Sequence, residues 1–258
     1  MADNIFEVKA LTFSYGKREV IKGLDFELHK GTITTLIGAN GCGKSTLFQL
    51  MTKNLKPDSG QILLGGQDIS TMKLRTFAKQ AAIVHQYNTA PADLTVEKLI
   101  SYGRTPYQRG GFAQQSKEDE EKIRWAMEIT HTYKHRDKPV AQLSGGQKQR
   151  VWIALALAQG TEILFLDEPT TYLDIRYQLQ ILKLIQSLNR EFGITIMMVL
   201  HDINQSLYYS DEIVAMHDGK VVANGIPQEV ITPQLVKEVY GVELDIRSVD
   251  GRPFVIPV

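Results

Sequence analysis

This chain has a single cysteine, Cys42, among its 258 residues. An intrachain disulfide is therefore excluded, and a reducing compartment fits the composition best. Lysine and arginine together number 29, and so do aspartate and glutamate. The chain thus lacks the positive excess that draws proteins to nucleic acid or anionic lipid, although a local basic patch stays compatible with this balance.

Leader sequences and long apolar runs are also missing. The segment Met1–Glu7 has neither a basic start nor an apolar run, so we expect no signal peptide. No uncharged apolar stretch reaches the roughly 18 residues that a membrane-spanning helix needs. The longest candidate, 151–166, is interrupted by Gln159, Gly160 and Glu162. We therefore expect a cytoplasmic chain that meets a membrane only through a partner.

The chain does have enough apolar residues, at 43%, for a complete core. Its length lies at the upper end of a single domain. Strand patterns over 6–15, 20–28 and 31–37 precede a glycine-rich turn at 38–43, which opens a helix predicted over 44–55. A strand, a glycine turn and a helix in this order begin an α/β unit.

The segment 87–142 has a different pattern, since it is polar and mostly helical, and we interpret it as a helical lobe inserted into the α/β core. Beyond it the core resumes. The expected elements are a helix over 146–158, a strand over 163–166, a helix over 173–192, a strand over 195–200, and two hairpins that turn at 218–219 and 250–251.

A phosphate-binding loop is the clearest motif. It matches the pattern G-x-x-x-x-G-K-[ST], between a buried strand and a helix, over Gly38, Ala39, Asn40, Gly41, Cys42, Gly43, Lys44, Ser45 and Thr46. Glycines let several backbone N–H groups point at phosphate oxygens, at a helix N-terminus that favours anions. Lys44 then neutralises the β- and γ-phosphates and Ser45 binds Mg²⁺. A glycine turn with an exposed lysine is the alternative, and Cys42 fits a small filler better than a reactive thiol.

Two adjacent carboxylates, Asp167 and Glu168, follow the apolar strand at 163–166. Ligands of open α/β sheets bind at the carboxyl ends of strands. We predict that Asp167 holds Mg²⁺ and that Glu168 orients or deprotonates the attacking water. The alternative is that these residues, followed by Pro169, only begin a helix.

A third motif narrows the class. Leu143-Ser144-Gly145-Gly146-Gln147 follows the helical lobe and precedes a helix, so it offers a serine hydroxyl and glycine N–H groups as a second anion site. Taken alone, it is also a flexible turn with a helix cap. Together with the phosphate loop and the acidic strand end, the pentapeptide resembles the signature of the ATP-binding cassette family.

The resemblance covers nearly the whole chain and implies an α/β fold: a phosphate-loop ATPase core with a mixed sheet, an antiparallel β subdomain and an inserted helical subdomain. One ATP-binding domain would then span 1–258, with its core at 1–86 and 143–258 and its helical subdomain at 87–142. We expect the chain to bind and hydrolyse ATP.

The resemblance also assigns roles to further residues. Tyr15 matches the aromatic residue that stacks on adenine, although it also fits a strand tyrosine packed in its sheet. Gln86 matches the glutamine that joins core to helical subdomain and senses Mg²⁺ and water. Asp174 matches the aspartate that touches the opposite subunit, and His201 matches the histidine that senses the γ-phosphate. Tyr172 departs from the family, because most members carry a small residue there.

Members of the family work as head-to-tail pairs. The resemblance implies an ATP-dependent homodimer in which Ser144, Gly145, Gly146 and Gln147 of one copy complete the pocket begun by Lys44 of the other. ATP and Mg²⁺ are the implied cofactors. The implied partners are integral-membrane permease subunits and, indirectly, a solute-binding protein, with the chain held peripherally at the cytoplasmic face of the membrane and no nucleic acid bound.

A narrower resemblance is to subunits that serve iron–siderophore, haem and cobalamin import in bacteria, with the ferric-siderophore branch favoured. It depends on the segments 102–107, 169–175 and 200–205 and on the tail at 240–258. Packing against a generic permease is the alternative reading of these segments. The rival functions are a soluble cassette ATPase that acts on nucleic acid or ribosomes, and a binding module with an inactive site.

Overall fold

The computed structural model describes residues 4–108, 115–249 and 252–256. The chain divides into two compact units, here called the first unit (1–72 and 195–258) and the second unit (73–194). No helix among the described residues is long and apolar enough to cross a membrane.

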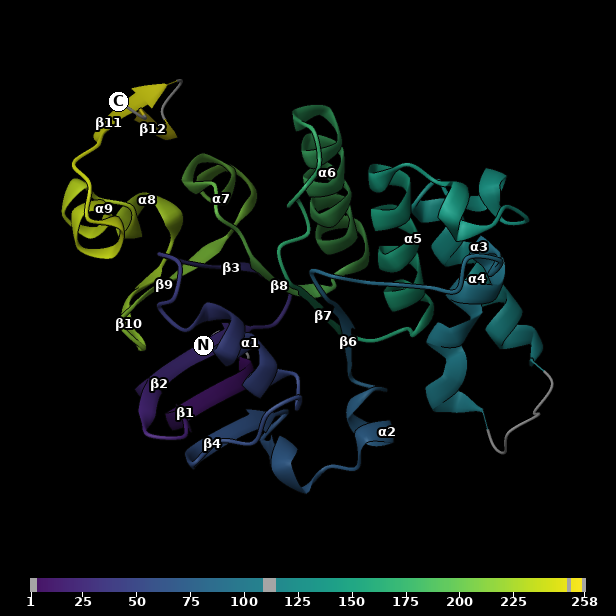
Figure 1. The fold of residues 1–258 in the computed structure, drawn as a ribbon, viewed down its shortest axis with the longest axis horizontal. Coiled ribbons are helices and arrows are strands. Elements are labelled where there is room, and N and C mark those ends of the chain that lie inside the picture. Colours follow the sequence, from purple (N-terminus) through teal and green to yellow (C-terminus); the bar gives the residue numbers. More distant parts are fainter. Residues whose placement is uncertain (1–3, 109–114, 250–251, 257–258) are drawn as a thin grey trace. The chain divides into compact units, whose positions relative to one another are not determined.

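An antiparallel sheet makes up one part of the first unit (Figure 1). Its strand order is β2-β1-β4-β5, with β1 at Asn4–Tyr15, β2 at Arg18–His29, β4 at Ser59–Leu64 and β5 at Gln67–Asp68. The short helix η1, Ile69–Thr71, follows β5. This sheet confirms the antiparallel β part of the predicted fold.

A bulge in β1 explains why its apolar alternation changes parity. Phe6 and Val8 are buried, and burial resumes at Leu11 and Phe13 instead of continuing at Ala10. Ala10 has a φ of 46°, in the left-handed region, and the pairing with β2 shifts between Val8 and Leu11. An inserted residue moves later side chains to the opposite face, which keeps both halves of the strand in the core.

A mixed sheet forms the rest of the first unit. Its order is β10-β9-β3-β8, with β3 at Ile33–Gly38, β8 at Thr195–Val199, β9 at Glu212–His217 and β10 at Lys220–Gly225. β3 pairs in parallel with both β8 and β9, and β10 is antiparallel to β9. All six residues of β3 are buried, as expected for a strand covered on both faces.

Helices and a terminal hairpin complete this unit. They are α1 at Lys44–Met51, α7 at Ile203–Tyr209, α8 at Pro227–Val230, α9 at Pro233–Tyr240, β11 at Asp245–Val249 and β12 at Arg252–Ile256. The side-chain amide of Asn204 on α7 donates to the carbonyl of Val255 and accepts from its N–H, at 2.9 and 2.8 Å. This pair of bonds fastens β12 to α7.

The second unit contains two parallel strands and most of the helices. β6, Ala81–Val84, pairs with β7, Ile163–Leu166. The helices are α2 at Leu74–Phe77, α3 at Val96–Ser101, η2 at Tyr102–Tyr107, α4 at Lys117–Ile129, η3 at Tyr133–His135, η4 at Val140–Gln142, α5 at Gly145–Ala158 and α6 at Ile175–Phe192. Figure 1 shows α3, α4 and α5 packed together.

The predicted elements are largely confirmed, with differences at their ends. The helix predicted over 44–55 ends at Met51, and the helix predicted from 173 begins at Ile175. The hairpin turn at 218–219 is present between β9 and β10. Residues 250–251 of the other predicted turn lie outside the described residues, but β11 and β12 on either side pair as expected. The subdomain bounds at 87–142 stay a prediction.

Candidate functional site

The phosphate loop lies at the carboxyl end of β3 and leads into α1. Gly43 precedes the helix with a φ of 110°, and Gly41 has a φ of 81°, both in the region that favours glycine. Asn40, Gly41 and Ser45 are exposed. Because the first amides of a helix have no acceptor within it, the N–H groups of the first turn of α1 are donors for an anion at this end.

Gly38 is required by close packing. Its φ is 154°, and a side-chain Cβ there would lie 2.5 Å from the carbonyl oxygen of Met216 and 2.6 Å from the sulfur of Cys42. Such distances are well inside van der Waals contact, so any larger residue would displace the loop from β9. Glycine at this position therefore sets how the loop leaves the sheet.

Lys44 is buried within this loop, with 5% of its surface exposed. Its ammonium donates to the carbonyl oxygens of Gly38 and Ala39, at 2.7 and 3.0 Å. The loop thus curls around the lysine head group, and an ammonium held this way has a third N–H that can serve a ligand. Backbone N–H groups that point into a turn attract anions, and a lysine ammonium beside them adds to that attraction.

Cys42 is a filler in this structure. Burial raises the pKa of its thiol, with the positive charge of Lys44 opposing that effect. A thiol with a raised pKa is a poor nucleophile near neutrality. Its sulfur instead packs against the loop, as the preferred reading of the sequence expected.

His201 emerges at the same sheet edge as the phosphate loop. β3 and β8 run parallel, with Leu36 opposite Val199, and the N–H of Leu200 donates to the carbonyl of Leu36 at 3.3 Å. His201 is exposed, and the Asp202 after it caps α7 by accepting from the N–H of Gln205 at 2.8 Å. The first unit therefore presents an imidazole and an anion-binding loop on neighbouring parallel strands.

Tyr15 ends β1, with half of its surface exposed at 51%. Its ring meets that of Phe13 edge to face, with the ring centroids 4.9 Å apart. Its exposed surface is compatible with stacking on a base, and its contact with Phe13 orients the ring. The role in adenine binding stays a prediction.

In the second unit, Gln86, Asp167 and Glu168 share one sheet edge. β6 and β7 are parallel with Val84 opposite Leu166, and the N–H of Asp167 donates to the carbonyl of Val84 at 2.9 Å. The residues that follow the two strands therefore emerge side by side. This is the placement that the sequence predicted for the carboxyl ends of strands.

Glu168 is held by two donors. The same carboxylate oxygen accepts from the side-chain amide of Gln86 at 2.5 Å and from the hydroxyl of Thr171 at 2.9 Å. Its φ is 48°, an uncommon conformation for a residue with a long side chain. Strained backbone at a polar site is typical of functional residues, because the surroundings must over-determine the geometry.

The reading of Asp167, Glu168 and Pro169 as a simple helix start is wrong. The next helix, α6, begins six residues beyond Pro169, at Ile175. Its cap is Asp174, whose carboxylate accepts from the N–H of Tyr177 at 3.1 Å. Asp174 is exposed, so this capping bond leaves its outer face available, and its predicted contact with a second subunit stays a prediction.

The pentapeptide at 143–147 forms the start of α5. Leu143 is buried, while Ser144 and Gly145 are exposed at the N-terminus of the helix. The side-chain oxygen of Gln147 accepts from the N–H of Ser144 at 3.0 Å. The segment is therefore a capped helix start, with its serine and first glycine turned to the surface.

Gly146 is buried for a reason that the sequence motif does not reveal. A Cβ on Gly146 would lie 2.4 Å from the ring of Tyr177 on α6. The ring covers this side of the α5 N-terminus, so no side chain larger than hydrogen fits. Close packing of α5 against α6 therefore requires glycine at this position, whatever the segment binds.

Several partners of the site residues escaped the sequence reading. Thr171 bonds to Glu168, and the exposed rings of Tyr87 and Tyr172 join by a hydroxyl–hydroxyl bond of 2.7 Å. Tyr87 follows Gln86 directly, so this pair links the segments after β6 and β7 a second time. No motif signals such contacts, because each joins residues some 80 positions apart or depends on a turn of irregular shape.

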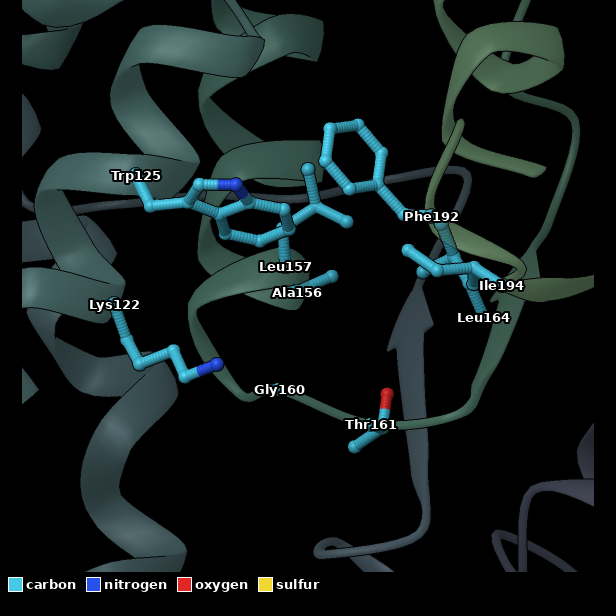
Figure 2. Close-up of a pocket in the computed structure, with 9 residues that line it drawn as sticks. All are labelled: Lys122, Trp125, Ala156, Leu157, Gly160, Thr161, Leu164, Phe192 and Ile194. Carbon is cyan, nitrogen blue, oxygen red and sulfur yellow. The ribbon is translucent and has the colours of Figure 1, made fainter. Parts of the chain in front are cut away.

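A separate pocket lies elsewhere on the second unit (Figure 2). Trp125 and Phe192, which meet edge to face, line it together with Leu157 and Lys122. Its volume is about 230 Å³. It lies at the C-terminal end of α5, whereas the pentapeptide lies at the N-terminal end, and a helix of 14 residues spans about 21 Å. None of the predicted site residues lines it.

Comparison with known proteins gives the family. The family model described as ABC transporter matches residues 21–171, which include the phosphate loop, the pentapeptide and the acidic strand end. The chain belongs to the ABC transporter family.

Among ABC transporter relatives, the chain is 45% identical over 243 residues to the iron(3+)-hydroxamate import ATP-binding protein FhuC of Bacillus subtilis, covering 94% of this chain and 90% of that protein. It is 42% identical to the ferric enterobactin transport ATP-binding protein FepC of Escherichia coli, covering 96% and 92%. It is also 46% identical to the petrobactin import ATP-binding protein FpuD of Bacillus anthracis, covering 97% and 92%.

Solved ABC transporter structures share the fold. The cbiO1 protein of Clostridium perfringens, part of the ABC transporter complex cbiONQ, is 33% identical, with a TM-score of 0.79 over 91% of this chain and 93% of that chain. A dimeric ATP-binding cassette bound to ADP and Pi is 25% identical, with a TM-score of 0.75 over 86% and 98%. These structures confirm the predicted α/β cassette fold.

Proposed function

We propose that this chain is the ATP-hydrolysing subunit of a bacterial importer that takes up an iron–siderophore complex through a separate membrane permease. The observation that carries the ATPase part is that the chain contains both a buried lysine inside a glycine loop and, on its second unit, the exposed, capped start of α5. Each is an anion site, and a nucleotide enclosed between two copies of the chain needs both.

The residues of the loop fit ATP and Mg²⁺. A fold in which Gly38 admits no side chain and Lys44 is wrapped by carbonyl groups leaves backbone N–H groups and one ammonium for phosphate oxygens. Ser45 and Asp167 supply the oxygen ligands that Mg²⁺ prefers, and this ion usually takes only one or two protein groups beside the phosphates. The remaining loop residues, Asn40, Gly41, Cys42, Gly43 and Thr46, complete the cradle.

Different residues have different roles in the proposed hydrolysis. Glu168 accepts a proton from, or orients, the attacking water, and Gln86 holds that carboxylate through its amide. His201 and Lys44 stabilise the charge on the transferred phosphoryl group. Tyr15 holds the adenine by stacking.

A second copy supplies the rest of the site. Ser144, Gly145, Gly146 and Gln147 bind the γ-phosphate of the nucleotide held by the other chain, and Asp174 contacts that chain. The dimeric cassette with bound ADP and Pi supports this arrangement for a structure of the same fold. The importer also includes permease subunits and a solute-binding protein, and it holds this chain at the cytoplasmic face of the membrane.

The cargo assignment comes from the relatives. Their names specify import or transport of iron(3+)-hydroxamate, petrobactin, achromobactin and ferric enterobactin, and they match this chain over nearly its whole length. An iron–siderophore complex is therefore the proposed substrate of the transporter. Deleting the gene and measuring uptake of radioactive iron with a panel of siderophores tests this part; undiminished uptake of every complex contradicts it.

Glu168→Gln tests the catalytic part. A glutamine keeps a side-chain oxygen that accepts from Gln86 and Thr171 but cannot take a proton from water. We expect ATP hydrolysis to fall by about 10²–10⁴-fold, the usual contribution of a general base, with ATP binding retained. Gel filtration with ATP should then show a stable dimer.

The matched control is Glu191→Gln, an exposed carboxylate on the last turn of α6. It makes the same change of charge far along the chain from the strand edges, and we expect turnover at the parent rate. Parent-like turnover in Glu168→Gln would contradict the assignment of the base.

A further inference from the structure

A histidine contacts the first turn of α5. The Nε2 atom of His135, the last residue of η3, is 3.3 Å from the side-chain nitrogen of Gln147. The oxygen of the same amide accepts from the N–H of Ser144 at 3.0 Å. A chain of contacts therefore runs from the imidazole through Gln147 to the exposed serine at the helix N-terminus.

The direction of these bonds follows from donor chemistry. A backbone N–H can only donate, so the amide atom of Gln147 that faces Ser144 is its oxygen. The amide nitrogen then faces His135 and must donate to it. Nε2 of His135 accepts, which means that this nitrogen carries no proton and that the neutral ring carries its proton on Nδ1.

The surroundings favour this neutral ring. Burial lowers the pKa of His135, and the positive charges of Lys138 and Lys134 lower it further. The Nδ1 atom is buried with no hydrogen-bond partner in the part of the chain that the structure describes. An unpaired buried N–H is costly. The ring therefore adopts a tautomer in which Nε2 accepts from Gln147 while the N–H at Nδ1 stays without an acceptor.

We propose that His135 is a positioning residue for the ATPase reaction: its unprotonated Nε2 fixes the Gln147 amide, which in turn fixes the first turn of α5 where a second copy's nucleotide binds. The proposal rests on the proposed function for its effect on hydrolysis. It adds a residue that lies outside the pentapeptide and touches neither nucleotide nor metal.

Protonation of His135 undoes the arrangement. With a proton on Nε2, two donors face each other, and the Gln147 amide must either move away or turn its oxygen toward the ring. Either change deprives the N–H of Ser144 of its acceptor. The capped start of α5 therefore requires a neutral imidazole, and acid disfavours it.

Two substitutions separate positioning from packing. His135→Leu removes the acceptor and retains an apolar side chain of useful size, whereas His135→Gln offers a side-chain oxygen near the place of Nε2. We expect His135→Leu to lower the maximal rate of ATP hydrolysis by about three- to tenfold, the effect of one neutral hydrogen bond. His135→Gln should restore most of the rate, and both should bind nucleotide as the parent does.

The control is His131→Asn, four residues earlier. His131 is exposed and has a φ of 58°, a conformation that asparagine tolerates well. We expect its turnover to equal that of the parent. Equal turnover in the parent and His135→Leu, or failure of His135→Gln to exceed His135→Leu, would overturn the positioning role.

A pH profile adds a readout that packing alone does not move. Because the pKa of His135 lies below the ordinary histidine value of about 6.5, the ring gains a proton only on acidification below that pH. The rate of the parent should therefore fall more steeply on acidification than that of His135→Gln, which does not titrate. Parallel profiles for these two proteins count against the proposal.

Nitrogen NMR of the parent protein tests the hydrogen bond from Gln147 to His135 directly, and this test does not depend on ATP hydrolysis. We expect the neutral ring of His135 to carry its proton on Nδ1. A proton on Nε2 at neutral pH would overturn the proposal by itself, since that nitrogen could not accept. Absence of ATPase activity together with an Nδ1 proton would instead refute the proposed function and leave the hydrogen bond standing.

Discussion

Arg104 is a buried charge of the second unit on which we expect the stability of that unit to depend, since only 2% of its surface is exposed. Its guanidinium donates to the carboxylate of Asp119 at 2.7 Å, to the carbonyl of Ala158 at the end of α5 at 3.0 Å, and to the carbonyl of the next residue, Gln159, at 3.3 Å. It also stacks on the ring of Tyr107, 3.9 Å from the centroid. One side chain thus joins η2, α4 and the C-terminus of α5.

Replacing Arg104 by methionine retains much of the volume but removes all of these donors. Asp119 is itself buried, with 7% exposed, so the variant leaves a carboxylate inside the unit without its cation, although Ser116 still donates hydrogen bonds to it. Breaking a buried ion pair in this way typically costs about 3–5 kcal/mol. At about 2–4 °C of melting temperature per kcal/mol for a chain of this size, we expect a loss of about 6–20 °C.

Thermal unfolding followed by circular dichroism measures this loss. Arg124→Met, which breaks an exposed pair with Glu128 on the surface of α4, is the matched control and should melt as the parent does. Adding Asp119→Asn to Arg104→Met removes the unpaired charge and should recover part of the loss. A loss of less than about 3 °C in Arg104→Met, roughly 1 kcal/mol, would refute the reasoning.

The same pair gives a dependence on pH. Burial raises the pKa of Asp119, but hydrogen bonds from Arg104 and Ser116 and the arginine charge outweigh it, so the pKa lies below its usual range. The pair therefore stabilises the parent above the unfolded pKa of aspartate, and that stability is lost as acid protonates the carboxylate. In Arg104→Met the carboxylate has lost its cation, so the difference in melting temperature between parent and variant should narrow as the pH falls below about 3.9, the ordinary pKa of aspartate.

Three further predictions concern the loop, the metal and the antiparallel sheet. Lys44→Ala should abolish measurable nucleotide binding in calorimetry, since it removes the buried ammonium; unchanged affinity would argue against the loop as the phosphate site. EDTA should stop ATP hydrolysis and excess Mg²⁺ should restore it. Gly60→Ala should lower the melting temperature by several degrees, because its Cβ would lie 2.4 Å from the carbonyl oxygen of Ala10; parent-like melting would contradict this.

The strands and the three motifs could be predicted from sequence because their signals are local. β7 is an uninterrupted apolar run, and β3 is a strand of apolar residues with two threonines among them. Each is followed at once by residues that suit a sheet edge, a glycine loop in one case and Asp167 and Glu168 in the other. The geometry of parallel strands then places these residues without knowledge of anything distant.

The ends of helices depended on contacts that no local pattern contains. α1 ends at Met51 because Lys53 takes a left-handed conformation, with a φ of 61°, and sends its ammonium to the carbonyl oxygens of Ile69 and Met72. The sequence predicted four further helical residues, since Lys53 and Asn54 are compatible with a helix. The two carbonyl groups that Lys53 contacts belong to η1 and to the residue that follows it, and both come after β4 in the sequence.

The supporting residues of the site were hidden for the same reason. Tyr177 makes Gly146 necessary, Thr171 holds Glu168, and His135 faces Gln147. Each contact joins side chains whose identities are individually ordinary. Only the folded chain reveals that a tyrosine, a threonine and a histidine determine how the motif residues are oriented.

The amide of Asn204 has a consequence for how this chain meets others. β12 pairs with β11 along one edge, and on its other edge the N–H and carbonyl of Val255 are both taken by that amide. An exposed strand edge invites pairing with a strand of another molecule, which leads to aggregation. Here a side chain occupies the place that an intruding strand would need, so the terminal hairpin is protected at that residue without a further strand.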